Sequence, residues 1–253
     1  MLKMYDLLNC NVSSKVETDD GVYCIIGQTM DKVVHFCDIT KAPHIVVGGC
    51  TGSGKSVLLH SIILSLITKY SPDKVGLVLL DLKGTEFGLY CDLPHVLYED
   101  NDSNVSLRAL SVELARRKRL FTKENQPFTQ RVVVIIDEYS LLDKEAQKIV
   151  KRLVRLGHGM GIHVILASQR ITRAYVPTDI RMYAETMVAC RVATKADSYY
   201  LLGEHGAETL QGYGDIFYRD RSGERIRLTS GYASGQEIQA IVELVKEKYK
   251  GRV

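Results

Sequence analysis

The sequence contains the stretch Gly49-Cys50-Thr51-Gly52-Ser53-Gly54-Lys55-Ser56, which matches the phosphate-binding pattern G-x-x-x-x-G-K-[ST]. An apolar run over His44–Val47 precedes it and a helical pattern over residues 55–69 follows it, which is the setting that the motif requires. Its glycines let the backbone wrap closely around a polyphosphate, so that amide N–H groups and the start of the helix point at it. A chance glycine-rich turn is the weaker interpretation, because motif and setting agree. We therefore expect these residues to bind ATP: Gly49, Cys50, Thr51, Gly52, Ser53, Gly54, Lys55, Ser56 and Val57.

Two side chains of this loop are expected to take part in the chemistry. Lys55 can reach the β- and γ-phosphates and is a candidate catalytic residue, and the Ser56 hydroxyl can ligate Mg²⁺. The loop therefore predicts ATP and Mg²⁺ as cofactors.

A second motif, Val132–Glu138, is an apolar run that ends in two acids. Such an ending places both acids at the carboxyl edge of a sheet, where ligands bind in α/β folds. Asp137 is expected to hold the water shell of Mg²⁺, and Glu138 to polarise the attacking water. On its own the motif would fit a strand followed by a helix N-cap equally well. The phosphate-binding loop upstream favours the catalytic interpretation.

A third apolar run ends in Ala167-Ser168-Gln169-Arg170. An amide at the end of a strand beside the nucleotide can sense the γ-phosphate and position water, so Gln169 is a further catalytic candidate, although a strand-end glutamine often only faces solvent. Together the three motifs predict an ATPase. A small GTPase is disfavoured because the base-reading tetrapeptide N-K-x-D is absent from the sequence, and a kinase lacks an obvious acceptor site or lid.

The order of apolar runs and helical patterns predicts one α/β domain over residues 41–253, with a short β-rich lead-in over residues 1–40 packed on it. Short continuous apolar runs that alternate with helices favour a mostly parallel sheet with helices on both faces. The expected strands are His44–Val47, Val75–Leu80, Val132–Ile136, His163–Ala167 and Met187–Val192, with lead-in runs at Val22–Ile26 and Val33–Phe36. The expected helices cover residues 55–69, 104–121 with Ser103 as N-cap, 143–156, and 235–249 with a Ser234/Glu237 capping box.

Composition excludes several classes of protein. The 253 residues are 45% hydrophobic and 25% charged, which is the balance of a globular protein with a large core. The longest apolar runs have five or six residues, whereas a membrane span needs about 20, so no membrane segment is expected. The start of the chain lacks the apolar stretch of a signal peptide. The six cysteines show neither C-x-x-C nor zinc spacing, which favours reduced thiols and a cytoplasmic location.

Several segments, in order along the chain, resemble the FtsK/SpoIIIE branch of the FtsK–HerA superfamily of DNA-pumping ATPases. Leu80-Asp81-Leu82-Lys83-Gly84-Thr85-Glu86 is similar to the branch's D-P-K-x-x-E-L segment. Asp137-Glu138-Tyr139 resembles its D-E-F motif, and Gly161–Arg170 its G-I-H-x-x-x-A-T-Q-R-P signature. Further matching segments are residues 42–49, 93–96, 113–117, 195–198 and 206–215, so that the resemblance covers roughly residues 25–248.

The resemblance implies a RecA-like motor that assembles as a hexameric ring around double-stranded DNA and holds ATP between subunits. In the family the loop after the glutamine faces the pore, which makes Arg170 and Arg173 candidate DNA contacts. A translocase must move over any sequence, so it needs cations that contact phosphates. The net charge is only +3, but residues 144–173 hold many cations against the single acid Glu145. A solvated helix face is the alternative for residues 144–155.

This sequence also departs from the family pattern. The usual arginine two places after the Lys-x-Asp segment is Tyr199, and the family's P-T-R-I segment reads Glu185-Thr186-Met187-Val188. Both departures leave the arginine finger, which acts on the neighbouring subunit's ATP, without an assigned residue. Arg191 is the first candidate, followed by Arg181 and Arg116.

The sequence therefore predicts a double-stranded DNA translocase motor. Since it shows neither a membrane anchor nor a winged-helix module, mobile-element DNA transfer or genome packaging is expected, with a membrane-bound or capsid-bound partner. One alternative is an ATPase that energises protein secretion; the Asp81-x-Lys83 segment and the basic loops favour DNA. Another is a slow, nucleotide-dependent assembly scaffold, which the two missing arginines keep open.

Overall fold

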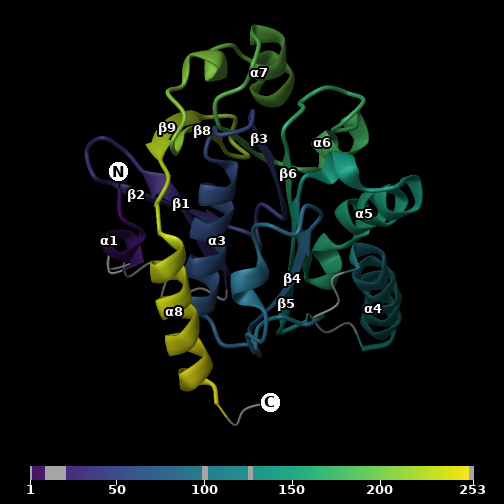
Figure 1. Ribbon diagram of the computed structural model, residues 1–253. Coiled ribbons are helices and arrows are strands. Elements are labelled where there is room, and N and C mark those ends of the chain that lie inside the picture. The colour runs from purple at the N-terminus through teal and green to yellow at the C-terminus, as the bar shows by residue number, and fades with distance from the viewer. Residues whose placement is uncertain (1, 9–20, 99–101, 125–127, 251–253) are drawn as a thin grey trace.

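The computed structural model describes residues 2–8, 21–98, 102–124 and 128–250 (Figure 1). In this part of the chain the strands form one nine-stranded sheet in the order β2-β1-β9-β8-β7-β3-β6-β5-β4. The strands are β1 Tyr23–Gln28, β2 Val34–Asp38, β3 His44–Gly48, β4 Val75–Asp81, β5 Arg131–Asp137, β6 Ile162–Ser168, β7 Thr186–Ala189, β8 Asp215–Arg219 and β9 Arg225–Thr229.

The five strands expected from apolar runs are confirmed as β3 to β7, and their pairings with one another are all parallel. β3 lies between β6 and β7, so the chain that leaves β3 enters the phosphate-binding loop between two parallel neighbours. The strands are buried on both faces, which explains why they read as continuous apolar runs. β7 is shorter than expected and ends at Ala189.

The prediction of a mostly parallel sheet is confirmed only in part, because the sheet is mixed. β8 and β9 form an antiparallel hairpin that pairs with β7, and the lead-in strands β1 and β2 continue the sheet in antiparallel fashion. β8 and β9 bury only alternate residues and carry charges between them, so they lack the continuous apolar run that revealed the parallel strands. β1 joins β9 through the pair Gln28↔Thr229, which makes the lead-in part of the same sheet.

Helices cover both faces of the sheet (Figure 1). One core contains residues of α1, α3 and α8, and the other contains residues of α4, α5, α6 and α7. Within β3, Ile45 and Val47 belong to the first core and Val46 to the second, as the period of two in a strand requires. The helices are α1 Met4–Leu8, α3 Lys55–Lys69, α4 Ser103–Glu124, α5 Lys144–Leu156, α6 Thr178–Tyr183, α7 Lys195–Leu202 and α8 Gly235–Lys248, with short 3₁₀ turns η1 Gly88–Tyr90, η2 Tyr139–Leu141, η3 His158–Met160 and η4 Ala207–Thr209.

Two helix starts were predicted from capping signals. The capping box of α8 is confirmed, since Ser234 and Glu237 bond reciprocally to each other's backbone N–H. The predicted N-cap of α4, Ser103, is wrong by one residue. Ser103 is already helical, and Asp102 accepts the backbone N–H of Asn104 at 2.8 Å instead. Among the described helices, none is both long and apolar enough to cross a membrane.

Candidate nucleotide site

The phosphate-binding loop connects β3 to α3, and two of its glycines are required by close approach of the backbone. A Cβ atom at Gly49 would lie 2.6 Å from Ser53 Oγ and 2.7 Å from Cys190 Cβ. Gly54 has φ +103°, and a Cβ atom there would lie 2.6 Å from the backbone N of Gly214. Side chains at either position would open the loop, so the motif's glycines have a direct steric cause.

Lys55 is held against the loop from which it projects. Its Nζ donates to the carbonyl oxygens of Gly49 at 2.7 Å and Cys50 at 3.3 Å. Burial lowers the pKa of Lys55, and the nearby carboxylates of Glu138 and Asp137 oppose this shift. The ammonium group therefore lies within the loop beside the acid pair.

A cavity of about 480 Å³ opens at the start of α3. It is lined by eight of the predicted site residues, which come from three segments of the chain: Thr51, Gly52, Gly54, Lys55, Ser56, Val57, Asp137 and Gln169. Of the acid pair, Asp137 lines the cavity and Glu138 does not. Gly49, Cys50 and Ser53 do not line it. The lining residues are Thr51, Gly52, Gly54, Lys55, Ser56, Val57, Lys83, Glu86, Asp137, Gln169, Tyr213 and Tyr232.

Asp137 and Glu138 are adjacent carboxylates whose side chains are only 3% and 4% exposed. Burial raises the pKa of Asp137, and the positive charge of Lys83 opposes the shift. The Ser56 hydroxyl and the Asp137 carboxylate line the same cavity, and oxygen donors of this kind suit Mg²⁺, which usually keeps several waters and phosphate oxygens as its other ligands.

Glu138 is built into the end of the sheet. It has φ +68°, a left-handed conformation that non-glycine residues adopt rarely. Its Oε1 accepts hydrogen bonds from Ser140 Oγ at 2.6 Å and Ser168 Oγ at 3.2 Å, and both carboxylate oxygens face the backbone N of Gln169 at 3.2 Å. Burial alone would raise the pKa of Glu138, but these hydrogen bonds and the charge of Lys83 bring it below its usual value. The carboxylate is thus kept ionised.

Gln169 links the acid pair to the phosphate-binding loop. Its side-chain Oε1 accepts a hydrogen bond from Thr51 Oγ1 at 2.9 Å, while its backbone N–H faces Glu138. Gln169 therefore connects the end of β6 to the loop between β3 and α3.

Four residues of the cavity, Lys83, Glu86, Tyr213 and Tyr232, are not assigned to the nucleotide site by the sequence. Lys83 stands in the D-P-K-like segment, where it was considered only as a sign of DNA; its Nζ lies 3.5 Å from Glu138 Oε2 and 3.9 Å from Asp137 Oδ2. Tyr213 and Tyr232 also line the cavity, and Tyr213 is 77% exposed. The sequence feature that could have pointed to a turn at Tyr213 is its place between Gly212 and Gly214. Both glycines have positive φ in the structure.

Arg191 lies beside the phosphate-binding loop of its own chain. Its carbonyl oxygen accepts the backbone N–H of Cys50 at 2.9 Å, and its guanidinium lies about 4.0 Å from the place of a Cβ atom on Gly212. The role of Arg191 as an arginine finger on a neighbouring subunit's ATP stays a prediction.

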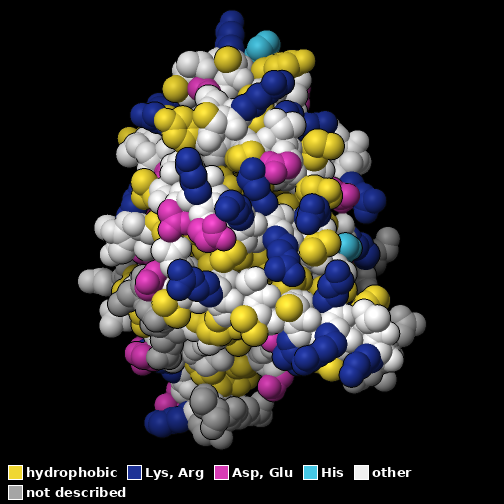
Figure 2. Space-filling model, turned by 90° about the vertical axis from the view of Figure 1, so that its right-hand side faces the viewer, with side chains coloured by type: hydrophobic (Ala, Val, Ile, Leu, Met, Phe, Trp, Pro, Cys, Tyr) yellow, Lys and Arg dark blue, Asp and Glu magenta, His cyan; other side chains and the backbone are white. Residues whose placement is uncertain are grey.

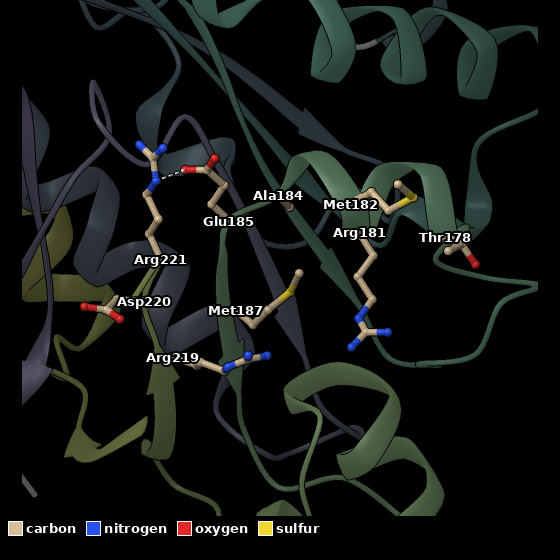
Figure 3. Close-up of a pocket in the computed structure, with 9 residues that line it drawn as sticks. All are labelled: Thr178, Arg181, Met182, Ala184, Glu185, Met187, Arg219, Asp220 and Arg221. Carbon is tan, nitrogen blue, oxygen red and sulfur yellow. Dashed lines mark ion pairs between the residues drawn. The ribbon is translucent and has the colours of Figure 1, made fainter. Parts of the chain in front are cut away.

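The two other arginine candidates lie elsewhere. Arg181 lines a separate cavity of about 460 Å³ between α6, β7 and the end of β8, where it faces the same space as Arg219 (Figure 3). The Arg181 guanidinium stacks over the Tyr200 ring at 5.0 Å. Arg116 forms a two-point ion pair with Glu113 on the exposed side of α4.

Arg170 and Arg173 are both exposed in the segment of residues 170–177 that follows β6. Arg170 stacks on Tyr175 and donates to its hydroxyl oxygen. Ile171 and Val176 are buried and anchor the two ends of the segment. The segment leads directly into α6, which packs beside α5.

Comparison with known proteins identifies the family. The model of the FtsK/SpoIIIE family matches residues 7–132. A DNA translocase FtsK from Leptospira interrogans is 31% identical over 266 aligned positions, which cover 94% of this chain and 28% of that protein. This chain belongs to the FtsK/SpoIIIE family. It is a P-loop ATPase, and it spans less than a third of the length of that FtsK relative.

Solved structures agree with this fold. The cytoplasmic domain of the type VII secretion ATPase EccC from Thermomonospora curvata superposes with a TM-score of 0.80 at 23% identity, covering 89% of this chain and 31% of that one. The pCW3 conjugation coupling protein TcpA, solved with ATPγS, superposes with a TM-score of 0.73 at 23% identity, covering 92% of this chain and 72% of that one. At this level of identity the two structures establish a shared α/β ATPase fold.

Proposed function

We propose that this FtsK/SpoIIIE-family chain is an ATP- and Mg²⁺-dependent motor that translocates double-stranded DNA. The observation that carries the proposal is a basic groove joined to the nucleotide site by one short segment. Residues 170–177 run from Gln169, which contacts Thr51 and Glu138, to α6, which forms one wall of the groove.

The groove lies between α5 and α6 and has a volume of about 460 Å³. Lysine and arginine side chains are spread over the face that α4, α5 and α6 form, with fewer acids among them (Figure 2). Lys151 pairs with Asp179 at 3.1 Å, whereas Arg152 and Arg155 are exposed and available to phosphates. The residues that line the groove are Lys148, Lys151, Arg152, Arg155, Asp179, Ile180 and Tyr183. A surface of this kind suits sequence-independent contact with a nucleic-acid backbone.

In the proposed reaction, Lys55 binds the β- and γ-phosphates, and Ser56 with Asp137 holds Mg²⁺. Glu138 polarises the water that attacks the γ-phosphate, and Gln169 senses whether that phosphate is present. The metal ion supplies charge neutralisation at the phosphates. Release of the γ-phosphate would then reach Arg170 and Arg173 through the short segment that follows Gln169.

We infer further that the active form is a homo-oligomeric ring, hexameric as in the family, with a membrane-bound or capsid-bound partner in mobile-element transfer or genome packaging. Mass photometry with ATPγS and DNA would test the ring; particles of a single chain at every concentration would contradict it.

Steady-state ATP hydrolysis with and without long double-stranded DNA, at low and moderate salt, tests the function, with Lys55→Ala as the blank. We expect a several-fold rise with DNA that fades as salt increases, because phosphate contacts release counterions. A flat response at high protein concentration would contradict a DNA motor. It would favour a secretion ATPase, or a scaffold if turnover is also slow.

A further inference from the structure

The segment after β4 is built around one carboxylate. Asp81 accepts backbone N–H groups from Lys83 at 3.2 Å, Gly84 at 2.9 Å, Glu86 at 2.6 Å and Phe87 at 3.0 Å. Burial alone would raise the pKa of Asp81, but these four donors hold it below its usual value. The backbone of residues 82–87 is therefore held around an ionised side chain rather than left as an open loop.

This segment is also tied to the helix that carries the phosphate-binding loop. Glu86 Oε2 lies 3.5 Å from His60 Nε2 on α3, and His60 Nδ1 lies 2.9 Å from the Tyr90 hydroxyl. Phe87 is buried in the core that α3 shares. The place from which Lys83 projects is thus set by the same helix that positions Lys55 and Ser56.

From this place the Lys83 side chain reaches the acid pair. Its Nζ lies 3.5 Å from Glu138 Oε2 and 3.9 Å from Asp137 Oδ2. In the described part of the chain, the contact with Lys83 is the one ion pair that Asp137 forms. Two adjacent carboxylates buried to this degree repel each other and are costly to keep charged without a cation nearby. Lys83 is 33% exposed, so its side chain retains freedom to move within the cavity.

A divalent metal ion and Lys83 compete for the same carboxylates. A metal ion bound to Asp137 would lie close to the Lys83 ammonium and repel it. Phosphates bound in the same cavity would give that ammonium a new ion-pair partner. Lysine suits such an exchange, because it is a compact point charge on a flexible stem.

We propose that Lys83 is a displaceable counter-ion, which neutralises Asp137 and Glu138 in the nucleotide-free protein and moves to the phosphates when ATP and Mg²⁺ enter the cavity. The inference rests on ATP and Mg²⁺ occupying this cavity and is independent of DNA. It makes Lys83 a positioning residue for the acid pair before binding and a phosphate contact afterwards.

The test compares wild type with Lys83→Met, which removes the charge at similar length, and uses two measurements other than turnover. Binding of Mn²⁺ to the nucleotide-free protein is followed by the EPR signal of the free ion, and binding of ATPγS is followed without metal. Without its competitor, Mn²⁺ should bind Lys83→Met about five- to tenfold more tightly. Without its phosphate contact, ATPγS should bind about five- to tenfold more weakly. Opposite shifts in the two affinities are the signature of an exchange.

Lys246→Met is the matched control, because Lys246 is 29% exposed and pairs with Glu243 at 3.3 Å, far along α8 from the cavity. It should leave both affinities at the wild-type values, and Lys83→Arg, which keeps the charge, should resemble wild type for Mn²⁺. Lys83→Gln serves as a second uncharged variant if Lys83→Met does not fold.

Unchanged or weaker Mn²⁺ binding in both uncharged variants would overturn the proposal. Failure of the proposed DNA motor would look different, since wild type would then hydrolyse ATP without responding to DNA while the two affinities in Lys83→Met still shifted in opposite directions.

Discussion

Glu138 combines two unusual properties in one residue. Its backbone is left-handed at φ +68°, and its carboxylate is almost fully buried while accepting hydrogen bonds from Ser140, Ser168 and Gln169. A left-handed conformation in a residue with a Cβ atom costs on the order of 1–2 kcal/mol, and such strain persists only where the surroundings enforce it. Here the enforcing contacts come from η2 and from the end of β6.

Glu138→Gln should separate binding from turnover. The amide has the shape of the carboxylate and can keep the hydrogen bonds to Oε1, but it cannot polarise water as a base. We expect kcat to fall by about 10²-fold or more while the dissociation constant for ATP changes little. The measurement is single-turnover hydrolysis beside equilibrium binding of ATP.

Glu145→Gln is the control for this change, because Glu145 is 71% exposed on α5 and lies outside the cavity. Normal turnover in Glu138→Gln would show that another group activates the water and would refute the assigned role.

Most of the candidate site could be predicted because its motifs are contiguous or stand at strand ends. Lys55 and Ser56 belong to one loop, and Asp137 and Gln169 each end an apolar strand. Lys83 and Tyr213 reach the same cavity only through folding. The position of the Lys83 side chain depends on the turn that Asp81 organises. The position of Tyr213 depends on a glycine-flanked turn that packs against Gly54. No local pattern specifies where such side chains point.

At the scale of elements, the join between the lead-in strands β1 and β2 and the rest of the sheet is narrow. β1 meets β9 at Gln28↔Thr229, directly after a break of register between Ile25 and Gly27 in the β1–β2 pairing. A Cβ atom at Gly27 would lie 2.6 Å from the carbonyl oxygen of Thr229, which is backbone and cannot turn away. Glycine is therefore what allows these strands to approach.

Gly27→Ala should lower the free energy of unfolding by about 1–3 kcal/mol, because the strands must separate to admit a methyl group. Urea denaturation followed by circular dichroism measures this. Gly88→Ala is the matched control, since a Cβ atom there meets nothing within 4 Å and should change stability by less than about 0.5 kcal/mol. Equal losses in both variants would show that the close approach is not what matters at Gly27.

The antiparallel half of the sheet illustrates what sequence patterns miss. β8 reads Asp-Ile-Phe-Tyr-Arg and β9 reads Arg-Ile-Arg-Leu-Thr, so each strand is short and interrupted by charge. Asp215 and Arg227 pair across the hairpin with a two-point ion pair, which keeps these charges at the exposed surface. Continuous apolar runs identify strands that are buried on both faces. They do not identify short strands such as β8 and β9, in which charged residues interrupt the apolar ones.

The basic side of α5 allows a test of the proposed DNA surface at the same scale. Val150 and Leu153 are buried, whereas Arg152 and Arg155 are exposed, so the charges can be reversed without entering the core. In Arg152→Glu/Arg155→Glu we expect DNA affinity to fall about tenfold or more, and the slope of log affinity against log salt to drop by about 2. Basal ATP hydrolysis should stay unchanged.

Lys248→Glu/Lys250→Glu changes the net charge by the same amount at the end of α8, on the other side of the molecule (Figure 1). It should leave the salt slope close to that of wild type. Equal losses of affinity in the two double variants would mean that DNA binding depends on the net charge of the protein and not on the α5–α6 groove.

At the scale of the whole molecule, two buried histidines in the parallel strands make the stability of the fold depend on pH. His44 opens β3 and accepts the backbone N–H of Val164 on its Nδ1 at 3.0 Å, so it must be neutral at that nitrogen. Burial lowers the pKa of His44 to about 4. Burial also lowers the pKa of His163, in β6, to about 3, with the nearby His44 and Arg131 adding to the shift.

The sign of the resulting pH dependence follows from linkage. The unfolded chain takes up protons on these histidines as pH falls through about 6.5, whereas the folded protein does not until pH approaches 4 or 3. Their neutral forms therefore favour the folded state fully above pH 6.5, and this stability is lost progressively below it. Burial lowers the pKa values of His60 and His95 as well, so they add to the same trend.

We expect the free energy of unfolding to be steady near pH 7.5 and to fall between about pH 6 and pH 5, with each deeply buried histidine adding up to roughly 1.4 kcal/mol per pH unit. Urea denaturation at half-unit intervals of pH measures the slope, and buried carboxylates with lowered pKa values enter only below this window. His163→Leu should reduce the slope, whereas replacing the exposed His205 with leucine should leave it unchanged. If His163→Leu keeps the wild-type slope, the buried pair is not what makes the fold sensitive to acid, and the mildly acidic range is then governed by other groups.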